Sequence, residues 1–199
     1  IIDEITEIKE KYADDRRTKI VPDEGELDIT ELIEEEDILI TLTKDGYIKR
    51  LPIDTYKVQN RGGKGIAAGN TKEGDFIKKI ITTNTHEDLL IFTSLGKVYS
   101  LEAYRIPEGS RTSRGQAIIN ILNLESGEKI TEMMALSEID KNSQVVLQTQ
   151  NGQIKKTDAE NFTNIRRNGI IAISLKDNDK LISVRQIEKD EELIISTQK

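Results

Sequence analysis

The feature that most constrains the fold is a short pattern that occurs three times along the chain. Each copy has an apolar run rich in Ile, Val, Leu and Thr, a turn that ends in glycine, and a second short run. The turn glycines are Gly46, Gly96 and Gly152, so the copies are 50 and then 56 residues apart. Asp-Gly or Asn-Gly between two such runs predicts a β-hairpin with a type I′ turn, which requires positive φ at both central residues. Leu95 in the second copy departs from this rule, because its side chain is strained at positive φ.

A basic loop follows each hairpin and ends in a second glycine, 19, 19 and 17 residues after the first: Gly65, Gly115 and Gly169. An acidic connector completes each copy with a turn at Gly74-Asp75, Gly127-Glu128 or Asn178-Asp179. A β unit that repeats about every 50 residues indicates a repeat architecture, and propeller-like blades suit it best. We therefore predict a mainly β fold with blades at about 37–87, 88–142 and 143–191, and the start of another at 192–199.

Residues 1–36 differ from the rest of the chain. Ile1, Ile5, Ile8 and Tyr12 recur at helical spacing and predict a helix over residues 1–16 with one narrow apolar stripe. Residues 18–36 form a connector. Its three adjacent glutamates, 34–36, are interpreted as a solvated face, because no histidine or further aspartate at ligand spacing supports a metal site. Since the chain starts without methionine, we expect it to be a piece of a longer polypeptide.

Charge is distributed unevenly, which matters more than the net charge of −7. Residues 1–36 hold 14 acidic and 5 basic side chains, whereas residues 37–199 hold 22 acidic and 24 basic ones. A local basic track can therefore bind an anion on an acidic protein. Cysteine is absent, which excludes disulfides and thiolate metal sites within this sequence. The longest apolar run has four residues, so we expect no membrane partner and a cytoplasmic location.

The basic loops are the candidate functional feature. The first contains Gln59-Asn60-Arg61-Gly62-Gly63-Lys64-Gly65, in which glycines free the backbone and two cations are available for an anion. The other two loops carry basic pairs at matching positions. A row of cations on successive blades can follow the phosphates of a duplex and release counterions, and nothing here resembles a motif that reads base edges. The pattern predicts phosphate contact and bending of duplex DNA, largely independent of base sequence.

The heptapeptide at residues 59–65 closely resembles the seven-residue box of the DNA gyrase A family, whose members belong to the type IIA DNA topoisomerases. The family pattern is Gln-(Arg/Lys)-Arg-Gly-Gly-(Arg/Lys)-Gly. Six of seven positions match, and Asn60 replaces a basic residue. Residues 15–18, 46–52 and 104–108 resemble the same family. The resemblance implies that residues 1–36 are the end of the coiled-coil tower helix with its linker. Residues 37–199 would then be the first part of the C-terminal β-pinwheel, a propeller variant whose blades exchange strands.

The resemblance also implies a function. The pinwheel would wrap duplex DNA around its basic rim, so that the parent type II topoisomerase introduces negative supercoils in an ATP-dependent reaction. No tyrosine stands in a matching catalytic context, so we expect no catalysis and no cofactor in this region. ATP and Mg²⁺ would bind to the gyrase B protein, the partner in an A2B2 heterotetramer. The residues assigned to DNA binding are Gln59, Arg61, Gly62, Gly63, Lys64, Gly65, Lys49, Arg50, Lys97, Arg111, Arg114, Lys155, Lys156, Arg166 and Arg167.

Two alternatives stay open at this point. One is the equivalent C-terminal domain of topoisomerase IV, in which the seven-residue box is usually degraded. The other is a propeller-like module that binds proteins, with incidental basic residues. Steep salt dependence of duplex binding would separate the two DNA-binding interpretations from the protein-binding one.

Overall fold

A computed structural model describes residues 2–14, 18, 29–53, 74–137, 139, 142–166, 168–188 and 190–196. The chain divides into two compact units, Ile1–Leu32 and Ile33–Lys199. The first contains α1 (Ile2–Tyr12) and a short 3-10 helix, η1 (Ile29–Leu32). The helix predicted to reach residue 16 ends at Tyr12, and the Ala13 amide donates a hydrogen bond to the Lys9 carbonyl. Asp14 would place a negative charge at the helix C-terminus, which the helix dipole disfavours.

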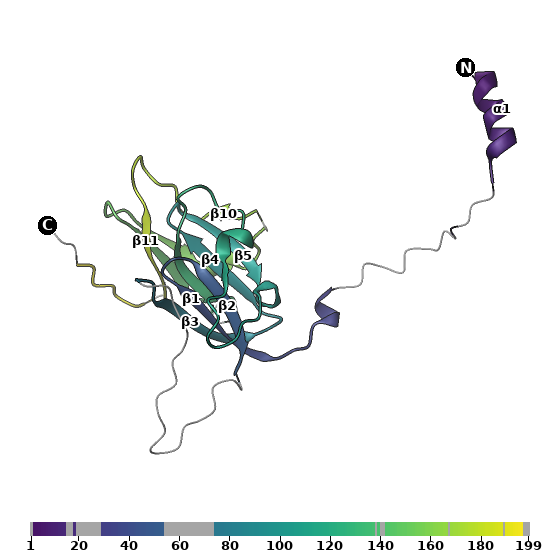
Figure 1. Cartoon of the computed structure of the whole chain (residues 1–199). Coiled ribbons are helices and arrows are strands. Elements are labelled where there is room, and N and C mark those ends of the chain that lie inside the picture. Colours follow the sequence, from purple (N-terminus) through teal and green to yellow (C-terminus); the bar gives the residue numbers. More distant parts are fainter. Residues whose placement is uncertain are drawn as a thin grey trace, which may run out of the picture. The chain divides into compact units, whose positions relative to one another are not determined.

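The described part of the second unit contains three antiparallel sheets, which are seen in Figure 1. Each sheet is here called a blade. In each blade the first strand of the repeat is central, with the second strand on one side and the third strand on the other. Blade 1 contains β1 (Asp37–Thr43), β2 (Tyr47–Pro52) and β3 (Ile77–Asn84); blade 2 contains β4 (Asp88–Thr93), β5 (Lys97–Glu102) and β7 (Ile130–Ala135); blade 3 contains β8 (Gln144–Thr149), β9 (Ile154–Asp158) and β11 (Leu181–Ile187). The predicted mainly β fold with three propeller-like blades is confirmed.

Blades 1 and 2 each take a fourth strand from the next repeat. The two-residue strand β6 (Gln116–Ala117) pairs with β2, and β10 (Ile170–Ile171) pairs with β5. This is the strand exchange that the family resemblance implies. Within the described residues, β9 of blade 3 pairs only with β8. The side of each blade formed by β2, β5 or β9 is called the outer edge below.

The apolar core lies between the blades. Blade 2 is the central one, and four consecutive residues of β4, Leu89 to Phe92, are fully buried. Leu89 and Ile91 pack with residues of blade 1, whereas Leu90 and Phe92 pack with residues of blade 3. The ring of Phe92 meets that of Phe162 edge to face, with 5.5 Å between ring centroids. Successive side chains of a strand point to opposite faces, so β4 joins both interblade cores.

The three predicted hairpins are present, but their turns are not of type I′. Gly46, Gly96 and Gly152 have φ values of 85°, 75° and 85°, whereas Asn178 is the one non-glycine residue with positive φ in the described chain. In each hairpin the glycine N–H donates to the carbonyl of a threonine three residues earlier, at 3.0 to 3.1 Å. This hydrogen bond is typical of a turn followed by a left-handed glycine, as found in short hairpin loops. Leu95 is tolerated because only the glycine needs positive φ.

A buried carboxylate from the connector fixes each hairpin turn. In blade 1, Asp75 Oδ1 accepts hydrogen bonds from the amides of Asp45 and Phe76, at 3.0 and 2.9 Å. In blade 3, Asp179 Oδ1 accepts from Asn151 and Lys180, at 3.0 and 2.8 Å. These contacts, together with those of Glu128 in blade 2, are called the turn locks. The three carboxylate residues come directly after Gly74, Gly127 and Asn178, which have positive φ in the predicted connector turns.

The turn locks shift the pKa values of two carboxyl groups. Burial alone would raise the pKa of Asp75, but hydrogen bonds from Thr43 and two backbone amides hold it below its usual range. The pKa of Asp179 is lowered in the same way against the effect of burial, with Thr149 in the place of Thr43. In blade 2 the longer Glu128 accepts a hydrogen bond from the Thr93 hydroxyl and another, at 2.8 Å, from the Glu125 amide.

The second unit also contains the short 3-10 helices η3 (Ala103–Arg105), η4 (Ile118–Asn120) and η5 (Ala159–Phe162). Residues 193–196, predicted to begin a fourth repeat, are not a strand, and Ile194 is 99% exposed. A strand needs a partner for its backbone groups, and this segment pairs with no strand that the structure describes. None of the described helices has the length and apolar character to cross a membrane.

Candidate nucleic-acid interface

The seven-residue box lies outside the described residues, as does Arg167. The DNA-binding roles predicted for Gln59, Arg61, Gly62, Gly63, Lys64, Gly65 and Arg167 therefore stay predictions. The structure places the other candidates on or beside the outer edges of the three blades: Lys49, Arg50, Lys97, Arg111, Arg114, Lys155, Lys156 and Arg166.

Residues 106–115, called the blade 1 loop, run along the outer edge of blade 1 although they belong to the second repeat. The Arg50 amide donates to the Pro107 carbonyl at 3.1 Å, and the Gly109 amide donates to the Arg50 carbonyl at 3.0 Å. The exchanged strand β6 follows directly and pairs with β2. The loop is thus tied to β2 near both of its ends. Arg111 and Arg114 are exposed on it.

Arg114 is also oriented by an aromatic ring. Its guanidinium lies over the ring of Tyr47, 5.3 Å from the centroid. A cation over an aromatic face is attracted by the ring quadrupole, so the side chain is held in place while its edge stays open to solvent. Tyr47 was not among the predicted site residues. The position of Tyr47, one residue after the hairpin glycine, does not indicate that it holds an arginine, because the two residues belong to different repeats.

Lys49 is buried, with only 4% of its surface exposed, and burial lowers the pKa of its ammonium group. Its Nζ donates to three carbonyls of the blade 1 loop: Ser110 at 3.1 Å, Arg111 at 2.9 Å and Ser113 at 2.8 Å. An ammonium group has three N–H donors, and all three are used here. This geometry argues against the direct DNA contact that we predicted for Lys49, because a phosphate would have to replace the loop.

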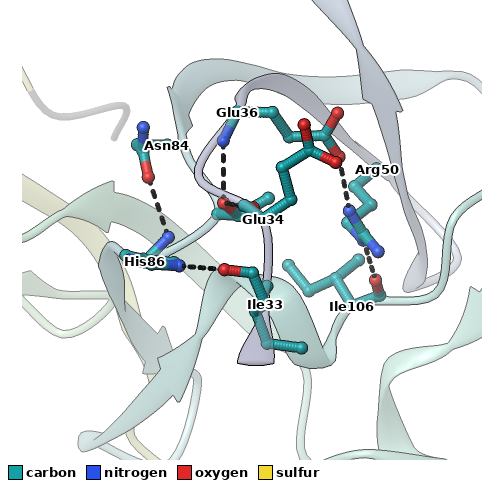
Figure 2. A network of polar contacts seen from close by, with 8 residues as sticks. Ile33, Glu34, Glu36, Arg50, Asn84, His86 and Ile106 are labelled. Atoms are coloured by element: carbon teal, nitrogen blue, oxygen red, sulfur yellow. Dashed lines mark hydrogen bonds and ion pairs between the residues drawn. The ribbon is translucent and has the colours of Figure 1, made fainter. Parts of the chain in front are cut away.

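Arg50 joins two segments that are distant in sequence, as Figure 2 shows. Its Nε donates to the Ile106 carbonyl at 2.9 Å, and its Nη1 forms an ion pair with Glu36 at 3.1 Å. The Arg50 side chain is 18% exposed. Arg50 therefore links the start of the blade 1 loop, at Ile106, to the segment that leads into β1, at Glu36. Its predicted contact with DNA would compete with the Glu36 carboxylate.

The segment at residues 33–36, assigned above to the linker, lies in the second unit and is bonded to the β3–β4 turn. The Thr85 hydroxyl donates to the Glu34 carbonyl at 2.8 Å and accepts from the Glu36 amide at 3.1 Å. His86 is exposed in that turn, and its Nε2 lies 2.8 Å from the Ile33 carbonyl oxygen (Figure 2). No sequence pattern signals these contacts, since they join residues about 50 positions apart.

On blades 2 and 3 the candidates differ in how available they are. Lys97 is partly buried and paired with Glu125, whose hydrogen bond raises the pKa of the lysine. Arg166 is exposed in residues 163–169, called the blade 2 loop, which lead into β10. Lys155 and Lys156 are exposed on β9, and Lys155 Nζ donates to the Ala172 carbonyl at 2.7 Å. The outer edges of all three blades therefore present cations, with an anion-binding chemistry that suits phosphates.

No group of three or more His, Asp, Glu or Cys side chains that could hold a metal ion occurs among the described residues. This surface offers positive charge, from exposed guanidinium and ammonium groups on successive blades.

Comparison with known proteins also points to a DNA-binding family. A family model described as DNA gyrase C-terminal domain, beta-propeller, matches residues 37–84, 87–137 and 143–188.

The chain belongs to the DNA gyrase C-terminal domain family. The three matched segments of this family model correspond to the three blades. The DNA gyrase A protein of Clostridium acetobutylicum is 48% identical over 199 residues, which is 100% of this chain and 24% of that protein. The DNA gyrase A protein of Staphylococcus aureus is 43% identical over 197 residues, covering 98% of this chain and 22% of that protein. The chain thus spans about a quarter of the length of these curated relatives.

Solved structures support the assignment to the gyrase C-terminal domain family. A DNA gyrase A C-terminal domain is 32% identical and has a TM-score of 0.57, over 78% of this chain and 50% of that one. The C-terminal domain of a DNA topoisomerase IV is 27% identical with a TM-score of 0.66, over 77% of this chain and 46% of that one. The resemblance to gyrase stated from the sequence is confirmed by the family model and by the gyrase A relatives.

Proposed function

We propose that this chain is the part of a gyrase A protein that binds duplex DNA along the outer edges of its blades and bends it. The observation that carries this proposal is the exposure of Arg111, Arg114, Arg166, Lys155 and Lys156 on the outer edges of three consecutive blades. A bent duplex that follows these edges would contact the cations of one blade after another. Contacts of this kind depend on backbone charge and shape and leave base sequence unread.

In the whole gyrase A protein, bending of this kind would feed one segment of DNA over another and so favour negative supercoiling. The described residues supply charge and shape to this process, and we propose that they take no part in strand cleavage. We further propose that ATP and Mg²⁺ bind to the gyrase B protein, and that both proteins form an A2B2 complex in the cytoplasm. The names of the curated relatives, both gyrase A proteins, support this proposal.

A salt titration tests the DNA-binding step. Binding of a labelled duplex of about 40 base pairs to the 199-residue chain is followed by fluorescence anisotropy across a range of salt concentrations. The logarithm of the association constant should fall linearly with the logarithm of salt concentration, with a slope of about −0.9 for each neutralised phosphate. Replacing both Arg111 and Arg114 by alanine should make the slope shallower by roughly 2. A duplex affinity that ignores salt would contradict the proposal and favour a protein-binding module.

A second candidate, the topoisomerase IV C-terminal domain, is favoured by the higher TM-score of 0.66 to such a structure. The identity of 43–48% to gyrase A proteins over the whole chain favours gyrase. Closure of nicked circular DNA in the presence of the full-length protein separates the two. Gyrase-type wrapping should change the linking number of the closed circles, whereas an unchanged linking number would favour topoisomerase IV.

A further inference from the structure

We infer that Lys49 is a positioning residue that shapes the blade 1 loop, so that Arg111 and Arg114 are held in place for a DNA backbone. This inference rests on the DNA-binding function proposed above. It gives the buried lysine a specific role in that function, through the loop rather than by its own contact with phosphate.

The three hydrogen bonds from Lys49 meet within four residues of chain. They end on the carbonyls of residues 110, 111 and 113, at 2.8 to 3.1 Å. The same turn is closed by the Ser113 amide, which donates to the Ser110 carbonyl at 3.1 Å, and by the Ser113 hydroxyl, which donates to that carbonyl at 2.9 Å. A compact ammonium group with three rotatable donors fits such a ring of carbonyls better than a planar guanidinium would. Arg111 itself supplies one of the carbonyls, so its backbone position depends directly on Lys49.

Two glycines show how closely the loop wraps this lysine. A Cβ on Gly109 would lie 3.1 Å from Lys49 Cδ and 2.6 Å from Ser113 Oγ. A Cβ on Gly115 would lie 3.0 Å from Lys49 Cβ and 2.4 Å from the Ile48 carbonyl oxygen. The distances to Ser113 and Ile48 are shorter than real Cβ atoms show, and those to Lys49 are shorter than most real Cβ contacts. The loop therefore packs closely around Lys49, with glycine on either side.

Tyr47 completes the arrangement from the same strand. Tyr47 and Lys49 are two residues apart on β2, so their side chains lie on the same face of the strand. The ring lies under the Arg114 guanidinium, and the ammonium holds the backbone of residues 110–113. One residue of β2 thus supports each arginine of the loop. The equivalent of Lys49 on blade 2 is Tyr99, which offers a single hydroxyl, 3.4 Å from Glu128 Oε2. The blade 3 equivalent, Lys155, donates one such bond, to the Ala172 carbonyl. Among the described residues, the three-fold support of a neighbouring loop by one ammonium group is therefore found on blade 1.

A mutant cycle on the 199-residue chain tests this role. Duplex affinity is measured by anisotropy for Lys49→Met, for the pair Arg111→Ala/Arg114→Ala, and for all three changes together. We expect the arginine pair to lower affinity about tenfold and Lys49→Met to lower it several-fold. The triple variant should bind as the arginine pair does, with the same salt slope. If Lys49 contacted phosphate directly, the triple variant would bind more weakly than the pair, with a slope shallower by a further 0.9 or so.

Hydrogen exchange provides a readout that does not depend on DNA. Lys49→Met should speed exchange of the Gly109 and Ser113 amides and leave the amides of β8 unchanged. Unchanged exchange in the loop would overturn the inference. Tyr47→Leu keeps the ammonium and serves as a second variant: it should weaken DNA binding about two- to threefold without altering exchange at residues 110–113. Unaltered DNA affinity in this variant would overturn the part assigned to Tyr47.

The two proposals can fail separately. If the arginine pair binds duplex DNA as well as the parent chain does, the proposed DNA-binding surface is wrong. The exchange result would then still decide whether Lys49 shapes the loop. If the arginine pair weakens binding but Lys49→Met leaves both affinity and loop exchange unchanged, the surface stands and the role of Lys49 is wrong.

Discussion

The hairpin end and the outer edge of the blades arise from the same three repeats, but only the hairpin end is built alike each time. There, a threonine closes each turn and a buried carboxylate locks it. At the outer edge, the position three residues after the hairpin glycine holds Lys49, Tyr99 or Lys155. The repeats therefore share what each hairpin needs in order to fold, and they differ in what each edge presents to solvent.

The two outer loops that the structure describes show this difference in detail. The blade 1 loop is bonded to β2 by backbone hydrogen bonds at Arg50 and by the ammonium of Lys49. In the blade 2 loop, Gly169 donates to the Arg166 carbonyl at 2.8 Å, a contact within the loop itself. Among the residues of this region that the structure describes, the backbone pairing with blade 2 is that of β10 with Val98 and Lys97. Within the described residues, the first loop thus makes more hydrogen bonds to its blade than the second, which suits a surface that presents two arginines.

The largest effect on stability should come from a glycine at an outer edge, compared with a glycine at a hairpin. Gly115 at the outer edge and Gly152 at a hairpin both have φ near 85°. Alanine at Gly152 meets nothing within 4 Å, so it should cost only the left-handed conformation, about 1–2 kcal/mol. Alanine at Gly115 would also lie 2.4 Å from the Ile48 carbonyl oxygen, which should add about 1–3 kcal/mol. Urea unfolding measures both variants, and equal losses would show that β6 does not pack as described.

The next effect compares the same substitution at equivalent positions on two edges. Lys49→Met leaves three loop carbonyls without their donor and should lower the free energy of unfolding by about 1–3 kcal/mol. Lys155→Met removes an exposed side chain with one such bond and should cost no more than about 0.5 kcal/mol. Thermal and urea unfolding of the matched pair measure the difference. A loss at position 155 as large as that at position 49 would contradict the distinction between the two edges.

The smallest effect concerns acid and the hairpin end. The pKa values of Asp75 and Asp179 are lower in the folded chain than the ordinary value of about 4. Their contribution to stability is therefore complete above that value and is lost as pH falls through the folded pKa. The double variant Asp75→Asn/Asp179→Asn should unfold more easily at pH 7 and differ less from the parent at pH 3. Asp177→Asn, at an exposed position of the same turn, is the control. A parallel loss at both pH values would mean that the carboxylate charge contributes nothing.

Much of the blade architecture could be predicted from the sequence, because its signals are local. The hairpin glycines, the connector turns and the apolar runs each act over a few residues. The turn type was wrong because Asp-Gly suits more than one turn, and only the φ of Asp45 and Leu95 separates them. Strand exchange came from the family resemblance alone, because a two-residue strand such as β6 has no periodicity of its own.

The site could be predicted less well, for a physical reason. A lysine beside an arginine on a strand is normally solvated, so Lys49 was assigned to DNA contact together with Arg50. The structure buries Lys49 under a loop from the next repeat, 61 to 64 residues further along the chain. Arg111 and Arg114 were found from the recurrence of basic loops, and both are exposed as a DNA contact would require.

The central claim is that DNA lies along the outer edge, and site-directed crosslinking tests it most directly. The sequence contains no cysteine, so a single introduced cysteine carries a photocrosslinker to one chosen place. Thr112→Cys and Asn164→Cys place it on the blade 1 and blade 2 loops, and Asn151→Cys places it at a hairpin end, all at exposed positions. With duplex DNA at low salt, the first two should crosslink strongly and the third weakly. Equal or stronger crosslinking from position 151 would contradict the account.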